Sequence, residues 1–269
     1  MRFVSLNAWG GREWQALSAW APQVGADIFC LQEMIRAPVP SPEWLEYADA
    51  ARVLPQRADL FGDMSALLPD HAAYFAAAAR GPLTDPQGRA FVSEHGLGAW
   101  VARDLAVAGL WQGFVHGAFR LDGWGPEPVP RTMQLFRNLA PSGGSSVVLG
   151  HLHGIRLPSG KGDSPERTRQ AKALVAALTA FRRQDEPCIL AGDFNLLPDS
   201  ATFEALRAIG LYDLVTGRGI ADTRTALYKK PQRHANYMLV SDGIRVTGFD
   251  VPATPEVSDH RPLILDFDF

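Results

Sequence analysis

Residues 187–195 have the sequence PCILAGDFN, an apolar run followed directly by polar residues. Its centre, CILA, is a short, solid apolar run, which is typical of a strand buried on both faces. Gly192 ends the run, and Asp193 and Asn195 follow it directly. Because Gly, Asp and Asn are also common turn formers, this stretch alone predicts only a buried strand and the turn after it.

Other short segments rich in β-branched and aromatic residues also predict strands, each bounded by Gly, Pro, Asn or Asp. They are residues 2–9, 27–33, 96–103, 131–139, 145–153, 236–241, 244–251 and 261–269. Polar side chains lie at or just beyond the ends of several of them, namely Asn7, Glu33, His151, His153, Asn236, Asp259 and His260. Because strand ends can point polar groups into a shared cleft, we expect these residues to form one site.

Helical periodicity occurs between the predicted strands. It predicts helices over residues 164–184 and 199–210, and two further helices within 13–25 and 43–54. Residues 111–131 are rich in Gly, Pro and aromatic side chains and predict a long loop. Many strands with helices between them favour an α/β fold in which stacked sheets are covered by helices.

Composition narrows the class of protein. The chain has 269 residues, 46% of them hydrophobic, with 26 basic and 29 acidic residues and a formal net charge of −3. This balance disfavours extensive binding of long duplex DNA, which depends on neutralising many phosphates. The two cysteines, Cys30 and Cys188, lie in apolar runs, and we expect buried free thiols. No signal-peptide layout and no long apolar run occur, so we expect a cytoplasmic enzyme without a membrane span.

Each polar candidate has an ordinary structural explanation when it is taken alone. A glutamate at a strand end, such as Glu33, usually faces solvent, and Asp259 and His260 would suit a polar loop before the last strand. His151 and His153 fit two unrelated imidazoles, or a zinc pair without a recognisable third ligand. Taken separately, these structural explanations are the stronger ones.

In their order along the chain, the same residues resemble the endonuclease/exonuclease/phosphatase superfamily, from Asn7 to Pro262. The motifs that carry the resemblance are SLNAWGG (5–11), LQE (31–33), HLHG (151–154), GDFN (192–195) and VSDHRPL (257–263). The resemblance implies one domain, residues 1–269, folded as a deoxyribonuclease-like four-layer α/β sandwich. In that fold two facing mixed sheets are flanked by helices.

The resemblance also implies a role for each candidate. Glu33 looks like the principal metal carboxylate, with Asn7 beside it and Asp259 as a further metal residue. Asp193 resembles the residue that orients or deprotonates the attacking water, and Asn195 the one that positions water and phosphate. His260 and His153 resemble the two histidines at the phosphate, and His151 occupies a neighbouring position often held by Asn.

Two positions depart from relatives. Asn236 stands where many relatives have an Asp that pairs with the histidine equivalent to His260, and we expect its side-chain oxygen to take over this hydrogen bond. Trp9 stands where AP endonucleases carry an additional metal carboxylate, so we do not expect close kinship to AP endonucleases.

The residues and the resemblance together predict a phosphoesterase that uses Mg²⁺ or Mn²⁺. We expect it to hydrolyse a phosphodiester by in-line attack of an activated water. The substrate would be a small phosphodiester, a nucleotide or a nucleic-acid end, and the protein a monomer. One alternative is a DNA or RNA endo- or exonuclease. The other is a binding protein with weakened catalysis, suggested by Asn236 and opposed by the intact Glu33, Asp193 and His260.

Overall fold

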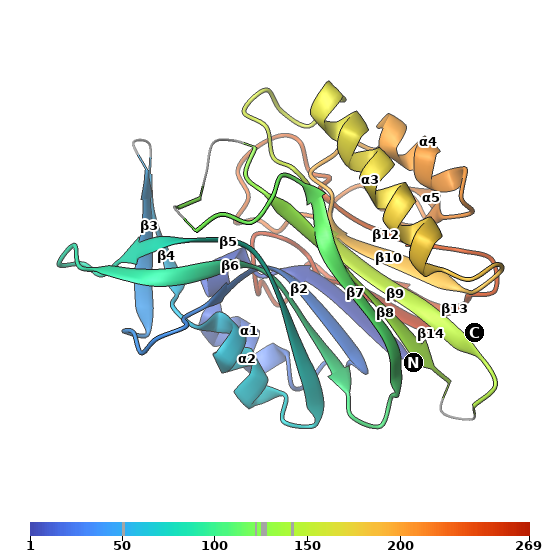
Figure 1. Ribbon diagram of the computed structural model, residues 1–269, viewed down its shortest axis with the longest axis horizontal. Coiled ribbons are helices and arrows are strands. Elements are labelled where there is room, and N and C mark those ends of the chain that lie inside the picture. The colour runs from blue at the N-terminus through green and yellow to red at the C-terminus, as the bar shows by residue number, and fades with distance from the viewer. Residues whose placement is uncertain (50–51, 122, 125–127, 141–142) are drawn as a thin grey trace.

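Two β-sheets face each other and helices cover their outer sides (Figure 1). The computed structural model describes residues 1–49, 52–121, 123–124, 128–140 and 143–269. Among these residues the first sheet has eight strands in the order β13-β14-β1-β2-β6-β5-β3-β4, and the second has six in the order β11-β12-β10-β9-β8-β7. The α/β four-layer sandwich expected from the sequence is therefore confirmed.

The strands of the first sheet are β1 (Arg2–Asn7), β2 (Ile28–Arg36), β3 (Trp44–Asp49), β4 (Arg52–Arg57), β5 (His71–Thr84), β6 (Ala90–Ala102), β13 (Arg245–Asp250) and β14 (Leu263–Asp268). Those of the second are β7 (Val107–His116), β8 (Arg131–Leu139), β9 (Ser146–His153), β10 (Cys188–Asp193), β11 (Tyr212–Asp213) and β12 (Asn236–Val240). The helices are the 3-10 turn η1 (Trp9–Gly11), α1 (Trp14–Trp20), α2 (Leu60–Leu67), α3 (Pro165–Phe181), α4 (Ala201–Arg207) and α5 (Leu214–Gly217).

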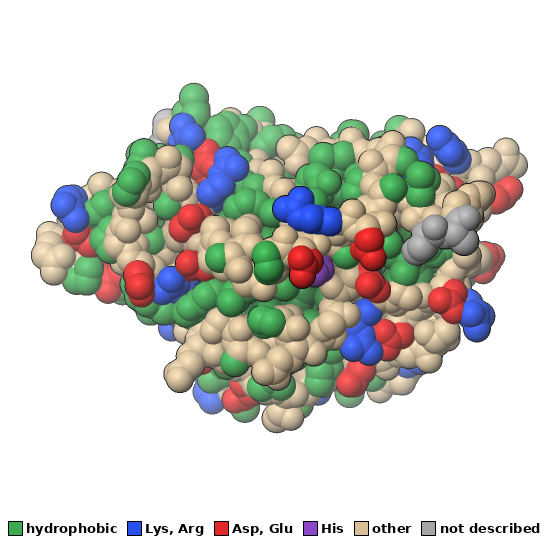
Figure 2. All heavy atoms as spheres, turned by 90° about the horizontal axis from the view of Figure 1, so that it is seen from below, with side chains coloured by type: hydrophobic (Ala, Val, Ile, Leu, Met, Phe, Trp, Pro, Cys, Tyr) green, Lys and Arg blue, Asp and Glu red, His purple; other side chains and the backbone are tan. Residues whose placement is uncertain are grey.

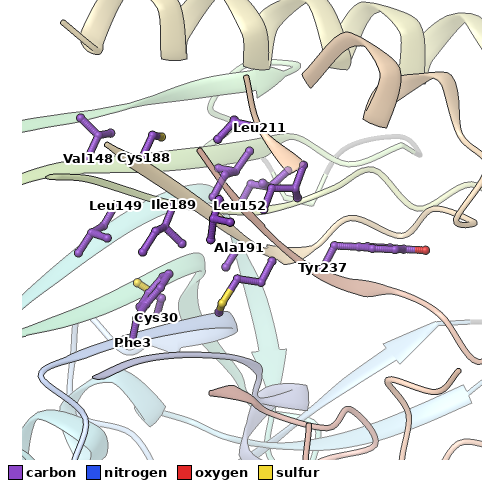
Figure 3. Close-up of a cluster of buried hydrophobic side chains, with 14 of the residues drawn as sticks. Phe3, Cys30, Val148, Leu149, Leu152, Cys188, Ile189, Ala191, Leu211 and Tyr237 are labelled. Atoms are coloured by element: carbon purple, nitrogen blue, oxygen red, sulfur yellow. The ribbon is translucent and has the colours of Figure 1, made fainter. Parts of the chain in front are cut away.

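The core between the sheets follows from the period-two alternation of strands. Leu149 and Ile189 of the second sheet point toward Phe3 and Cys30 of the first (Figure 3). Neighbouring residues along the same strands, such as Cys188, point instead toward the helices (Figure 3). Both cysteines are buried and free, as expected.

The outer cores attach the helices to the sheets. Leu17 of α1 and Met64 of α2 pack with Val4 and Phe29 on the outer face of the first sheet. On the other side Leu174 of α3 joins the core of the second sheet. Within the described residues, no helix has both the length and the apolar character needed to cross a membrane.

Parallel pairing brings the predicted strand ends to common edges. Strand β1 runs parallel to β2, which sets Asn7 beside Gln32, and β9 runs parallel to β10, which sets His153 beside Asp193. Strand β12 pairs antiparallel with β10 and sets Asn236 on the other side of Asp193. Glycine is required here, because a Cβ on Gly192 would lie 2.1 Å from the carbonyl oxygen of Leu152.

The helix predicted within residues 43–54 is wrong. Strands β3 and β4 pair antiparallel across this segment, with Trp44 opposite Arg57, and residues 50–51 lie outside the described part of the chain. Leu45 is buried with Ile35 and Leu83 of the same sheet. Sheet pairing and this burial therefore outweigh the helical pattern of the segment.

The long loop predicted for residues 111–131 is wrong over its first part. Residues 111–116 belong to β7, which pairs antiparallel with β8 from Gly109 opposite Arg137 to His116 opposite Arg131. The described residues from 117 to 130 are irregular, as expected, and residues 122 and 125–127 lie outside the described part. Strand β5 was not predicted, because its alanine-rich sequence carries little β propensity and forms a strand through pairing with β6.

Candidate active site

Strained backbone marks the place where the polar strand ends meet. Trp9, Glu33 and Asn195 have φ angles of 52°, 56° and 55°, a left-handed conformation that side-chain-bearing residues rarely adopt. A bulge in β2, between Leu31 and Met34, accompanies the left-handed Glu33. Bulges re-aim side chains and commonly lie beside active sites. The local distortion therefore coincides with the residues that the sequence singles out.

Asn7 connects the two sheets at this point. Its Nδ2 donates to Glu33 Oε1 at 3.1 Å and to Asp193 Oδ2 at 2.9 Å. Its Oδ1 accepts a hydrogen bond from the backbone amide of Trp9 at 2.9 Å, which supports the left-handed turn. One buried amide thus holds a carboxylate from each sheet in a fixed relationship.

Asp193 lies at the centre of the group and is 1% exposed. Its Oδ1 accepts a hydrogen bond from the backbone amide of Asn195 at 2.9 Å. Its Oδ2 lies 3.8 Å from Nε2 of His153 and 3.6 Å from Nε2 of His260. A carboxylate fixed by donors on both oxygens and flanked by two imidazoles can orient a small polar molecule between them.

The tautomer of His153 follows from its neighbour Arg131. Arg131 Nη1 lies 3.2 Å from His153 Nδ1, and since a guanidinium only donates, Nδ1 accepts this hydrogen bond. The ring proton is then on Nε2, which lies 3.9 Å from Glu33 Oε1. Burial holds the pKa of His153 well below its usual value, and the nearby Arg131 lowers it further.

His260 is held between an amide and a guanidinium. Its Nδ1 donates to Asn236 Oδ1 at 2.7 Å, the hydrogen bond expected from the sequence. The amide orientation is fixed, because Asn236 Nδ2 donates to the carbonyl oxygen of Arg261 at 3.2 Å. His260 Nε2 accepts a hydrogen bond from Arg224 Nη1. Burial keeps the pKa of His260 well below its usual value, and Arg224 lowers it further. The imidazole is therefore neutral.

Asp259 is the third carboxylate of the group and is 7% exposed. Its Oδ2 accepts a hydrogen bond from Arg224 Nη1 at 2.8 Å, whereas Oδ1 has no hydrogen-bond partner among the described residues. Burial raises the pKa of Asp259 to about 7, and the nearby Glu33 and Asp193 add to the rise while Arg224 opposes it. The site thus contains an incompletely satisfied carboxylate close to two others.

His151 does not join the group, although it lies two residues from His153. It is fully buried in β9, and its Nε2 lies 2.7 Å from Gln134 Oε1. Burial lowers the pKa of His151 to about 3. In the described ranges no three His, Cys, Asp or Glu side chains form a metal-holding group.

Basic residues flank the group. Lys161 is buried and its Nζ donates to the carbonyl oxygen of His234 at 2.5 Å. Burial lowers the pKa of Lys161 to about 8, and the nearby Arg224 contributes. Arg167 is bonded to backbone carbonyls, including that of Asn195 at 3.2 Å. Arg131 and Arg224 were not predicted, because single arginines outside a motif give no signal in the sequence.

Two aromatic residues of the 111–131 segment have structural contacts. Trp111 packs on the core between the sheets, and Trp124 lies edge-to-face on His95, with ring centroids 4.7 Å apart. His95 itself is bonded through Nε2 to Gln56 Oε1 at 3.1 Å. These contacts give Trp111 and Trp124 a structural role in anchoring the segment.

The site thus consists of two carboxylates fixed by one amide, with two neutral imidazoles beside them. The family model described as the endonuclease/exonuclease/phosphatase family matches residues 4–260. The chain belongs to the endonuclease/exonuclease/phosphatase family. Membership of this family supports a phosphoester hydrolase. No curated protein sequence matches the chain.

Solved structures with this fold come from distant relatives. A mannosyl-6-phosphatase of Bacteroides thetaiotaomicron superimposes with a TM-score of 0.71 at 16% identity, covering 100% of both chains. The human Nocturnin catalytic domain, with bound sulfate, gives 0.66 at 16% identity and covers 100% of this chain and 93% of its own. Truncated TDP2 of Caenorhabditis elegans gives 0.59 at 16% identity, covering 99% and 96%. At such identities the likeness extends to the fold alone.

Proposed function

We propose that this protein is a divalent-metal-dependent phosphoesterase that cleaves a small phosphodiester. The observation that carries the proposal is the position of Asp193, whose Oδ2 lies within 4 Å of an imidazole nitrogen from each of two histidines. Hydrolysis of a phosphate ester needs a prepared water, donors for the charge that grows on the phosphoryl oxygens, and a group that stabilises the leaving oxygen. Carboxylate, amide and imidazole side chains of this site are suited to these tasks.

The donor set suits a hard divalent cation. Glu33 and Asp259 are carboxylates and Asn7 is an amide, which are the oxygen ligands that Mg²⁺ and Mn²⁺ prefer. The unpartnered Oδ1 of Asp259 is the kind of atom that such an ion satisfies. A Mg²⁺ site needs only one or two protein carboxylates, since water and substrate oxygens complete it. We assign Glu33, Asn7 and Asp259 to this ion, which would polarise the phosphoryl group when bound.

The remaining residues supply the other steps. Asp193 is proposed to orient the attacking water and to take up its proton, because its carboxylate is held in place by Asn7 and Asn195. Asn195 is proposed to position water and phosphate. His153, with its proton on Nε2, is proposed to donate a hydrogen bond to a phosphoryl oxygen. His260, oriented by Asn236, is proposed to lie against the scissile phosphate.

Surface charge supports a small substrate over a long nucleic acid. On the face drawn in Figure 2, Lys and Arg side chains are separated by Asp and Glu and form no continuous basic track. With 26 basic and 29 acidic residues, the chain has no overall excess of positive charge. A protein that neutralises many phosphates loses affinity steeply with salt, by roughly 0.9 log units per phosphate for each tenfold increase in salt.

The test is hydrolysis by the purified protein of a panel of phosphodiesters, phosphomonoesters, single-stranded RNA and duplex DNA, with Mg²⁺, Mn²⁺ or excess chelator. We expect metal-dependent turnover of a small diester, strongly reduced in Asp193→Asn prepared in parallel. Full activity in chelator would refute the metal mechanism. Preferred cleavage of DNA or RNA with a steep salt dependence would favour the nuclease, and metal and phosphate binding without turnover would favour the weakened binding protein.

A further inference from the structure

Arg224 is a buried cation in the candidate site that no motif indicated. It is 5% exposed and lies after α5, where residues 222–225 have the sequence DTRT. Its Nη1 is shared between Asp259 Oδ2 at 2.8 Å and His260 Nε2. Its Nε has no hydrogen-bond partner among the described residues. A guanidinium has five N–H donors, so this one keeps capacity for a further acceptor.

The backbone of Arg224 is fixed by its neighbours. Its amide donates to Asp222 Oδ1 at 2.7 Å. Its carbonyl oxygen accepts hydrogen bonds from Arg261 Nε at 2.8 Å and from Arg233 Nη2 at 3.0 Å. The Tyr228 ring lies 4.2 Å from the Arg224 guanidinium carbon, an arrangement favourable to a cation. These restraints hold Arg224 in one position before any ligand binds.

The hydrogen bonds of His260 determine whether its imidazole or the Arg224 guanidinium can donate to a phosphate oxygen. Because Nδ1 donates to Asn236 and Nε2 accepts from Arg224, the imidazole has no proton free for a phosphate oxygen. Arg224, in contrast, is charged at every working pH and forms strong hydrogen bonds to phosphate. The same amide at position 236 that holds His260 brings no negative charge of its own.

We propose that Arg224 is a catalytic residue that binds a non-bridging oxygen of the scissile phosphate. It supplies the fixed positive charge that the His260–Asn236 pair does not. The proposal rests on the proposed function of the site, because the ligand is the phosphoryl group of that reaction. A purely structural Arg224 would only neutralise Asp259, and its loss would lower stability without changing the affinity of the folded protein for phosphate.

The experiment compares wild type with Arg224→Gln, Arg224→Lys and Arg245→Gln. Arg245 of β13 is an exposed arginine paired with Asp268 of β14, so its loss matches the change in charge away from the site. Inorganic phosphate is titrated calorimetrically with and without Mg²⁺, and folding is checked by circular dichroism and thermal melting. We expect Arg224→Gln to raise the Kd for phosphate at least about tenfold, as the loss of a charge-assisted hydrogen bond does. Arg224→Lys should be intermediate, and Arg245→Gln should match wild type.

Activity on the best phosphoester is measured on the same proteins. Loss of a single preorganised donor should lower kcat/KM on the order of 10²-fold in Arg224→Gln. A folded Arg224→Gln with unchanged phosphate affinity and kcat/KM overturns the proposal. If Arg224→Gln does not fold, an unchanged phosphate affinity and rate in Arg224→Lys overturns it instead. Phosphate binding that depends on Arg224 in a protein without phosphoesterase activity supports the anion site and refutes the proposed function.

Discussion

His260 Nδ1 donates a 2.7 Å hydrogen bond to Asn236 Oδ1, so the partner of this imidazole is a neutral amide. The bond fixes the ring but adds no negative charge, and the other ring nitrogen faces the Arg224 guanidinium. The pair therefore holds a neutral imidazole between an amide and a permanent cation.

Asn236→Asp should move the acidic limit of the kcat/KM profile upward, because the wild-type site holds His260 in its neutral form. A carboxylate beside His260 favours imidazolium and raises its pKa, which this structure holds well below the usual value through burial and Arg224. The protonated form would then persist to higher pH. The pH profiles of wild type and variant on one phosphoester measure the shift, with Asn236→Ser as a neutral control. An unchanged acidic limit in the folded Asp variant would contradict this account.

Glu33→Gln should weaken binding of Mg²⁺ and Mn²⁺ at least about tenfold, because a neutral amide replaces an anionic oxygen ligand. Isothermal titration of the metals measures the change. Glu204→Gln, on the exposed side of α4, is the matched control and should bind metal like wild type. Equal affinities in the two variants would remove Glu33 from the metal site.

Asp193→Asn should lower kcat on the order of 10²-fold or more and leave KM within a few fold. The carboxylate is proposed to act on water mainly in the transition state, so its loss affects the rate more than the binding. Steady-state kinetics on the preferred phosphoester separate the two constants. A near-normal kcat would exclude Asp193 as the general base.

Metal affinity should fall as the pH drops below about 7. Burial raises the pKa of Asp259 to about 7, so below this pH the carboxyl carries a proton that the metal must displace. Displacement of one proton weakens the affinity up to about tenfold per pH unit. Titrations at pH 6 and pH 8, in buffers of different ionisation enthalpy, count the protons released. Asp259→Asn should bind more weakly and with a flatter pH dependence, and a wild type with no pH dependence would refute the assignment.

Glu186 should contribute to stability above about pH 4.5 and lose that contribution in acid. Burial raises its pKa, but hydrogen bonds from Arg137 at 2.8 Å and from Ser146 outweigh burial and lower it from 4.5 to about 2. A lowered carboxyl pKa stabilises the fold above the unfolded-state value, and the gain is lost as the pH falls toward 2. At about 1.4 kcal/mol per unit, the shift corresponds to on the order of 3 kcal/mol.

Urea unfolding of wild type and Glu186→Gln between pH 7 and pH 2 measures this contribution. The variant should be less stable at pH 7 and depend less on pH below 4.5, whereas Glu204→Gln should follow wild type. Parallel curves for Glu186→Gln and wild type would show that the Arg137–Glu186 pair has no such role.

The sequence by itself determined the fold class and predicted that polar residues at the strand ends form the candidate site. Solid apolar runs such as CILA can only be buried between layers, so the polar residues that follow them lie at the ends of buried strands. Residues as far apart as Asn7 and Asp193 could be grouped because each follows a strand. Their order along the chain then matched one family, and the family model covers residues 4–260.

Only the tertiary structure decided which residues complete the group and in what state. Residues 43–54 became a hairpin because sheet partners far along the chain offered more burial than a helix did. His151 and His153 are two residues apart on one strand, yet only His153 reaches the carboxylates. Arg224 lies in the site because its backbone pairs with that of His260 in an isolated antiparallel β-bridge. The local sequence of neither segment predicts this pairing. Hydrogen-bond partners and burial set the protonation of each group, and both depend on contacts across the fold that no stretch of sequence contains.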